Sequence, residues 1–180
     1  MYELEELEVI TRLYMLDELE KELSKPHFVE PSLSADGRTV WEDLLREAII
    51  YGDEATLKLT LLYPKLWQPR AALSQKGADM GTSSTFEKMV GEFACHEFNT
   101  WYIRGMSRRL MDEGENECRV YRAERSWEPQ GSCLHHDGKT LKVQDIYEGH
   151  RARYWPKETK GAFSIPFDRR CHHTIGRIER

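Results

Sequence analysis

The stretch from Ser84 to Gly114, STFEKMVGEFACHEFNTWYIRGMSRRLMDEG, carries the clearest helical signal in the chain. Its first four residues match a capping box, and Gly114 supplies a stop after a run that contains no proline. Apolar residues recur in it every three to four positions: Phe86, Val90, Phe93, Phe98, Trp101, Tyr102, Met106 and Leu110. This spacing predicts one long helix with a buried face, at the centre of the fold.

Shorter helices are predicted before this stretch. An amphipathic helix from Tyr2 to Leu23 is expected to bury the apolar side chains Leu7, Ile10, Leu13, Leu16 and Leu19. A turn at Asp36-Gly37 precedes a helix from Val40 to Tyr51, for which Thr39 is the expected N-cap. Asp53 is the expected N-cap of a further helix that ends near Tyr63.

After Gly114 the helical spacing gives way to short β-prone segments, namely Cys118 to Arg122, Thr140 to Ile146, Phe163 to Phe167 and Thr174 to Ile178. The predicted fold class is therefore α+β. Residues 1–116 form a helical region with one long central helix, and residues 117–180 form a small β-rich module. Neither repeats nor low-complexity tracts interrupt this organisation.

The composition favours a soluble globular chain. Hydrophobic residues make up 39% of the 180 residues and charged residues 32%, and the mean hydropathy is −0.68. The longest apolar stretches span a few residues, and the first residues lack the basic start and apolar run of a signal peptide. We expect a protein of the cytoplasm or of an assembled particle that is not secreted and has no membrane partner.

The net charge of −5 is distributed unevenly along the chain. Residues 1–118 hold 13 Lys and Arg against 23 Asp and Glu, whereas residues 119–180 hold 13 against 8. This asymmetry predicts an interaction surface on the basic part. The segment from Gly149 to Trp155 alternates cations with aromatic rings, so the nucleic-acid candidates are Arg151, Arg153, Tyr154 and Trp155. Alternatively, the two aromatic side chains hold a loop on the sheet while both arginines face solvent.

Histidine and cysteine are concentrated in two short runs of the basic part, Cys133 to Asp137 and Asp168 to His173. A sheet module of this size has little core of its own, and zinc is a common staple for such modules. The predicted ligands of a structural zinc are Cys133, His136, Cys171 and His173, with His135, Asp168 and His172 less favoured. Adjacent strand positions point to opposite faces, which leaves the choice of histidine open. The alternatives are ordinary polar loop residues or, since nothing indicates secretion, a less favoured disulfide.

Three runs together resemble a known domain: Cys118 to Arg125, Cys133 to Lys139, and Pro166 to Ile175. They are similar to the C-terminal domain of phage Mu-like minor head proteins, the MuF-type head morphogenesis family. There a strand leads into C-x2-C-x-x-x-D-G-K, and the domain closes with P-x-H-P-x-C-R-C. On that pattern Cys133 and Cys171 match cysteines, while His136 and His173 replace cysteines. Asp168 stands where the family has histidine, and the Asp-Gly-Lys follows His136 directly.

The resemblance implies a structural, non-catalytic protein of a phage or prophage-derived head. Its expected partners are portal or capsid proteins, and the basic module would contact packaged DNA. One alternative is a metal-dependent hydrolase or nuclease that uses the His/Asp/Cys cluster. Catalytic motifs such as H-E-x-x-H and G-x-S-x-G are absent from the sequence, however, and two cysteines with two histidines form a closed zinc site without a position for substrate. A second alternative is a cytosolic adaptor or regulator that binds its partner through the acidic helical part.

Overall fold

The computed structural model describes residues 2–24, 30–68, 83–124, 135–154, 165 and 171–178, with the backbone alone at 83 and 151–154. The chain divides into two compact units. We call Val29–Phe98 the helical unit, and Met1–Phe28 together with Asn99–Arg180 the sheet unit. This division differs from the predicted boundary after residue 116, because the first helix and the second half of the central helix group with the sheet.

The helical unit contains α2 (Ala35–Tyr51), α3 (Glu54–Leu61), the 3₁₀ turn η1 (Pro64–Leu66) and the first half of α5 (Ser83–Asp112). Asp53 caps α3 as predicted, because its carboxylate accepts a hydrogen bond from the Thr56 amide at 2.8 Å. The predicted start of α2 is wrong. Its N-cap is Ser34, whose hydroxyl accepts from the Gly37 amide at 3.0 Å, so Asp36-Gly37 forms the first turn of the helix.

Aromatic side chains form the core of the helical unit. Trp67 packs edge-on against Phe86 and Phe93, with ring centroids 6.2 and 5.5 Å apart. Trp41 lies 5.2 Å from Phe93 on a tilted plane. The Trp67 indole N–H donates to the carbonyl of Leu61 at 2.8 Å, which satisfies its polar atom inside this core.

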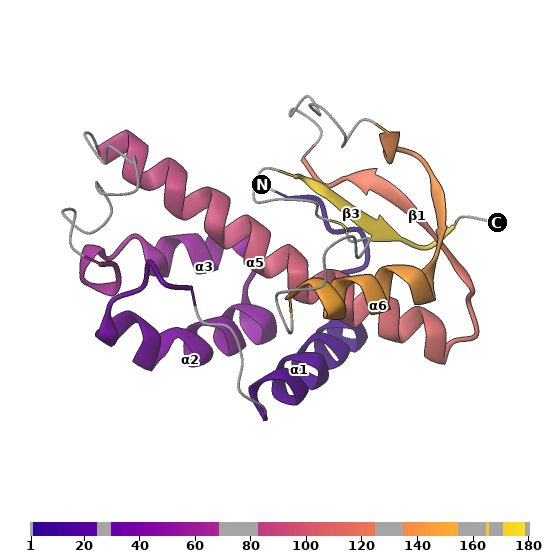
Figure 1. Cartoon of the computed structure of the whole chain (residues 1–180), viewed down its shortest axis with the longest axis horizontal. Helices are drawn as coiled ribbons and strands as arrows, with labels where there is room; N and C mark the ends of the chain where they lie inside the picture. Colours follow the sequence, from indigo (N-terminus) through magenta and orange to yellow (C-terminus); the bar gives the residue numbers. More distant parts are fainter. Residues whose placement is uncertain are drawn as a thin grey trace. The chain divides into compact units, whose positions relative to one another are not determined.

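The sheet unit contains α1 (Val9–Leu23), the second half of α5, β1 (Glu117–Arg122), β2 (Thr140–Lys142), α6 (Val143–Tyr154) and β3 (His173–Gly176). The three strands form an antiparallel sheet in the order β2-β1-β3 (Figure 1). Val120 pairs with Ile175 across β1 and β3. The carboxamide of Asn99 on α5 donates to the His173 carbonyl at 2.8 Å, which ties this helix to β3.

The central helix is confirmed, as α5, and so is the α+β class of the described residues. On α5 the predicted side chains Val90, Phe93, Phe98, Trp101, Tyr102, Met106 and Leu110 are buried. The strands predicted at 118–122 and 174–178 correspond to β1 and β3. Of the strand predicted at 163–167, the structure describes residue 165 alone.

The predicted strand from Thr140 to Ile146 is wrong beyond Lys142, where α6 begins. The buried side chains Val143, Ile146, Tyr147 and His150 recur at three- and four-residue intervals, which is a helical period. The backbone of residues 149–154, which the sequence assigns to a loop, therefore lies in α6.

The predicted buried face of the first helix is only partly right. Leu19 is buried as predicted, whereas Ile10 and Leu13 are 41% and 56% exposed, and the other buried positions of α1 are Thr11, Met15 and Glu18. A Cβ atom at Gly105 of α5 would lie 2.7 Å from both the backbone nitrogen and Cγ of Met15. The absence of a side chain at Gly105 thus lets α1 approach α5 closely, and this contact selects the face that α1 buries.

This close approach makes Gly105 a sensitive position. We expect Gly105→Ala to lower the free energy of unfolding by about 1–3 kcal/mol, because overpacking against the Met15 backbone outweighs the helix propensity gained. Gly91→Ala on the same helix is the matched control, since its Cβ would meet only the flexible Lys58 side chain at 3.5 Å. Urea denaturation of both variants tests this, and equal stabilities would contradict the packing contact.

Candidate metal centre

The turn that carries His136 is fixed by hydrogen bonds to β1. Gly138 donates to the Val120 carbonyl at 2.9 Å, and Val120 donates back to the Lys139 carbonyl at 2.8 Å. Gly138 has a φ of 73°, a left-handed conformation that glycine adopts without a steric penalty. The Asp-Gly-Lys run thus closes the turn before β2 and places residues 135–137 beside β1.

Cys171 and His173 lie together at the start of β3. The Cys171 Sγ is 3.6 Å from Nδ1 of His173, and both side chains are buried. His172 has different neighbours: its Nδ1 lies 2.9 Å from Glu124 Oε2, and its ring lies 5.5 Å from that of Tyr2. The alternation of an extended chain therefore pairs Cys171 with His173 and directs His172 elsewhere.

Asp137 connects the turn to this pair. Its carboxylate lies 3.1 Å from Nε of Arg122 on β1 and 3.7 Å from Nε2 of His173. His173 consequently has its Nδ1 near the cysteine sulfur and its Nε2 near a carboxylate. The 3.7 Å separation is longer than a hydrogen bond, so Asp137 acts on His173 through its charge.

Burial favours the neutral form of two histidines near the sheet, His136 and His173. Desolvation lowers the pKa of His173, and the cations of Arg122 and the neighbouring histidines lower it further, while Asp137 acts in the opposite direction. Desolvation, followed by the charge of Lys139, also lowers the pKa of His136. The neutral imidazole is the form that binds a metal ion.

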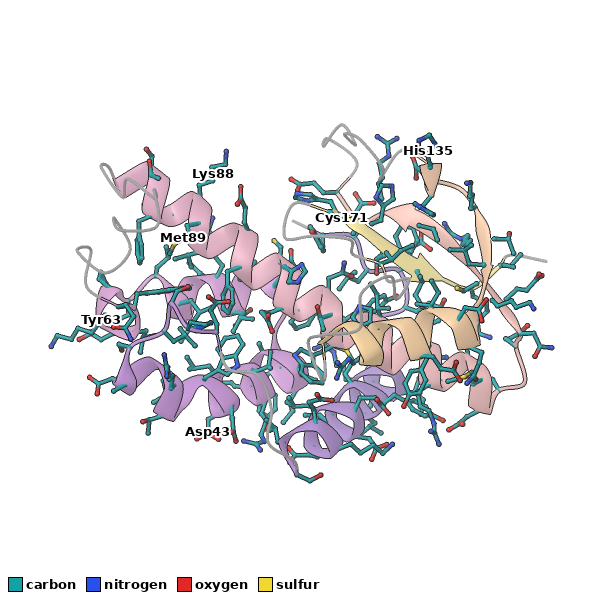
Figure 2. All side chains as sticks on the ribbon, viewed as in Figure 1. Asp43, Tyr63, Lys88, Met89, His135 and Cys171 are labelled. Carbon is teal, nitrogen blue, oxygen red and sulfur yellow. The ribbon has the colours of Figure 1, made fainter. Side chains whose placement is uncertain are left out.

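The structure brings together some of the predicted ligands. Cys171 and His173 are adjacent, whereas His135 is exposed in the turn before β2, at a separate position from Cys171 (Figure 2). Cys133 and Asp168 lie outside the described residues. Within the described part of the chain, no group of three His, Cys, Asp or Glu side chains could hold a metal ion.

The geometry of the Cys171–His173 pair fits two ligands of one zinc ion. With Zn–S and Zn–N bonds of about 2.3 and 2.05 Å at a tetrahedral angle, sulfur and nitrogen lie about 3.6 Å apart. The separation of Sγ and Nδ1 in the structure is 3.6 Å. The separation is therefore compatible with two ligands of one ion, and it equally suits a hydrogen bond between a thiol and an imidazole.

The predicted nucleic-acid residues lie at the end of α6. The backbone of Arg151, Arg153 and Tyr154 is helical, their side chains are not described, and Trp155 lies outside the described residues. Elsewhere in the basic part, arginines of the sheet pair with carboxylates of the chain. Arg119 pairs with Glu5, and Arg177 lies 3.3 Å from Glu6, so both carboxylates come from outside residues 119–180. The positive excess of residues 119–180 is thus partly neutralised within the protein.

Two features of this unit escaped prediction. One is Asp137 as a partner of His173, although its position next to His136 in a turn was a usable signal. The other is the pairing of the acidic residues before α1 with arginines of the sheet, for which the sequence carries no local signal.

A surface pocket of about 700 Å³ lies elsewhere in the unit, lined by Gly114, Glu115, Asn116, Glu117, Lys142, Gln144 and Ile178, none of them a predicted site residue.

Comparison with known proteins finds no matching family model, no matching curated protein and no matching solved structure. Among the described helices, none combines the length and the hydropathy needed to span a membrane.

Proposed function

We propose that the chain is a structural, non-catalytic component of a phage or prophage-derived head that works beside portal or capsid proteins. The observation that supports this most is the Cys171–His173 pair beside Asp137, on a sheet whose motifs resemble those of minor head proteins. Because Arg119 and Arg177 pair with Glu5 and Glu6, DNA contact has less support than the net charge of residues 119–180 suggested, and DNA forms no part of the proposal.

In this proposal Cys171 and His173 hold a structural zinc together with His136 and Cys133, and His136 has to move toward the pair, because the described side chains contain no group of three that could hold a metal ion. The His136 turn is hydrogen-bonded to one side of β1, and β3 pairs with the other side. A zinc ion bound by all four residues would cross-link segments on both sides of the middle strand. Asp137 would then lie beside Nε2 of the bound His173, and two thiolates with two imidazoles would leave no open position for a substrate.

Metal analysis tests the zinc. Full-length protein purified without chelator should contain about one zinc per chain, as expected for a four-ligand structural site. Removal of the zinc with a chelator should lower the melting temperature of the protein, because metal binding is coupled to folding. A metal-free protein with an unchanged melting temperature would contradict the zinc site while leaving a role in the head open.

Particle analysis tests the role in the head. Head particles purified from induced lysogens of the source strain should contain this protein, together with portal protein, when examined by quantitative mass spectrometry. Genes for portal, protease and major capsid protein should also lie next to its own gene. Absence of the protein from purified particles would contradict the proposed function, whatever the zinc analysis shows.

A further inference from the structure

The segment before α1, Tyr2–Glu8, is held on the sheet unit mainly by side chains, and we call it the clasp. Within the described part of the chain, its Glu3 amide donates to the carbonyl of Ala123, just after β1, at 2.7 Å. The amides of Glu5 and Glu6 donate to the hydroxyls of Tyr121 and Tyr102 at 3.0 and 3.3 Å. Tyr2 is buried and contacts the ring of His172.

Three carboxylates of the clasp pair with arginines from three separate parts of the sheet unit. Glu8 lies 2.6 Å from Arg109 on α5, and Glu5 pairs with Arg119 on β1. Glu6 accepts from both the backbone amide of Arg177 at 2.9 Å and its guanidinium at 3.3 Å. The described clasp is therefore a short acidic peptide with an aromatic side chain at its start, bound along a row of cations.

The groups that receive the clasp each have a second partner outside it. Arg109 pairs with Glu113 at 2.8 Å, and Arg177 pairs with Glu113 and, at 3.8 Å, with Glu115. Arg119 donates to the Arg177 carbonyl at 3.1 Å and stacks on the ring of Tyr121.

If the clasp left this surface, Arg109, Arg119 and Arg177 would therefore each still contact another carboxylate, carbonyl or aromatic ring. The guanidinium groups of Arg109 and Arg177 are also partly exposed, at 11% and 34% of their side chains, so water could replace the lost carboxylates. The surface that receives the clasp is thus preformed, and the ion pairs that hold the clasp are sensitive to salt.

We propose that the clasp is an exchangeable internal ligand of an acidic-peptide docking surface formed by Tyr102, Arg109, Arg119, Tyr121 and Arg177. The partner that fits this surface is an extended segment of another protein with an aromatic residue followed, three to six positions later, by glutamates or aspartates. Such a segment displaces the clasp and takes over its arginine contacts. This proposal depends neither on the zinc site nor on a role in a phage head.

A labelled peptide with the clasp sequence, YELEELE, is the probe, and its binding is measured by fluorescence anisotropy. The variant Glu5→Gln/Glu6→Gln/Glu8→Gln weakens the internal ligand, so we expect it to bind the probe at least about tenfold more tightly than the native protein. Adding Arg177→Gln should remove the gain. Asp36→Asn/Asp43→Asn/Glu47→Gln on α2 loses the same number of negative charges and should bind like the native protein.

Raising the salt from about 50 to 500 mM should weaken probe binding to the clasp variant, because screening shortens the range of the ion pairs. A folded clasp variant that binds no better than the native protein would overturn the proposal. So would equal binding of a probe with glutamine at every glutamate. If the triple variant does not fold, Tyr2→Ser weakens the clasp without changing its charge, and the same two outcomes apply to it.

Discussion

The proposed zinc site predicts that replacing Cys171 with serine releases the metal and strongly destabilises the sheet unit. Structural zinc sites in small modules contribute on the order of 10 kcal/mol of binding free energy that is coupled to folding. Serine is a poor zinc ligand, and the Sγ–Nδ1 contact of 3.6 Å with His173 would be lost together with the metal. Metal analysis should then give well below one zinc per chain.

Hydrogen exchange with mass spectrometry can localise this effect. Amides of β1 and β3 should exchange faster in Cys171→Ser, while those of α2 and α3 should keep their protection. Cys95→Ser is the matched control, because Cys95 lies on α5 within the helical unit and is less buried than Cys171. Full zinc content and native exchange in Cys171→Ser would contradict the assignment of Cys171 as a ligand.

The second large effect is expected at Arg104, whose side chain is 2% exposed. Its guanidinium lies 2.9 Å from Glu22 of α1 and stacks on the ring of Trp101 at 4.9 Å. Arg104→Ala leaves a carboxylate that is only 13% exposed without its cation and also opens a cavity. We expect a loss of about 3–5 kcal/mol in the free energy of unfolding, measured by urea denaturation.

A double variant separates the charge from the volume. Arg104→Met/Glu22→Leu replaces both charges with apolar side chains, so its stability should return to within about 1–2 kcal/mol of the native protein. Arg108→Ala on the same helix is the matched control, since that exposed ion pair with Asp112 is worth less than about 1 kcal/mol. A similar small loss for Arg104→Ala and Arg108→Ala would show that the Arg104–Glu22 pair contributes little.

Local sequence signals correctly predicted those helices and strands whose caps and periodicity depend on neighbouring residues alone. The capping residue Asp53 and the apolar period of α5 depend on backbone hydrogen bonding and helical spacing alone. The same holds for β1 and β3, where a short β-prone segment became a strand. Prediction was wrong where two periods could describe one segment, as at residues 140–146, where burial in the tertiary structure follows the helical period.

The sequence predicted which residue types form the candidate site, but it was less clear about which individual histidines belong to it. The sequence suggested Cys171 with one of two adjacent histidines, and the alternation of β3 pairs Cys171 with His173. The buried face of α1 was predicted correctly at Leu19 and missed at Met15, because Ile10 and Leu13 fit a buried stripe as well as Met15 does. The close contact between Gly105 and Met15 determines which face of α1 is buried.

The sequence alone therefore determined the α+β class, the central helix and the two runs of histidine and cysteine, because propensity and periodicity act over neighbouring residues. Tertiary structure alone decided that residues 1–28 join the sheet unit and that Glu5, Glu6 and Glu8 neutralise Arg119, Arg177 and Arg109. These ion pairs join residues about a hundred or more positions apart, and Coulomb attraction depends on distance in space. The net charge of a segment contains no information about that distance.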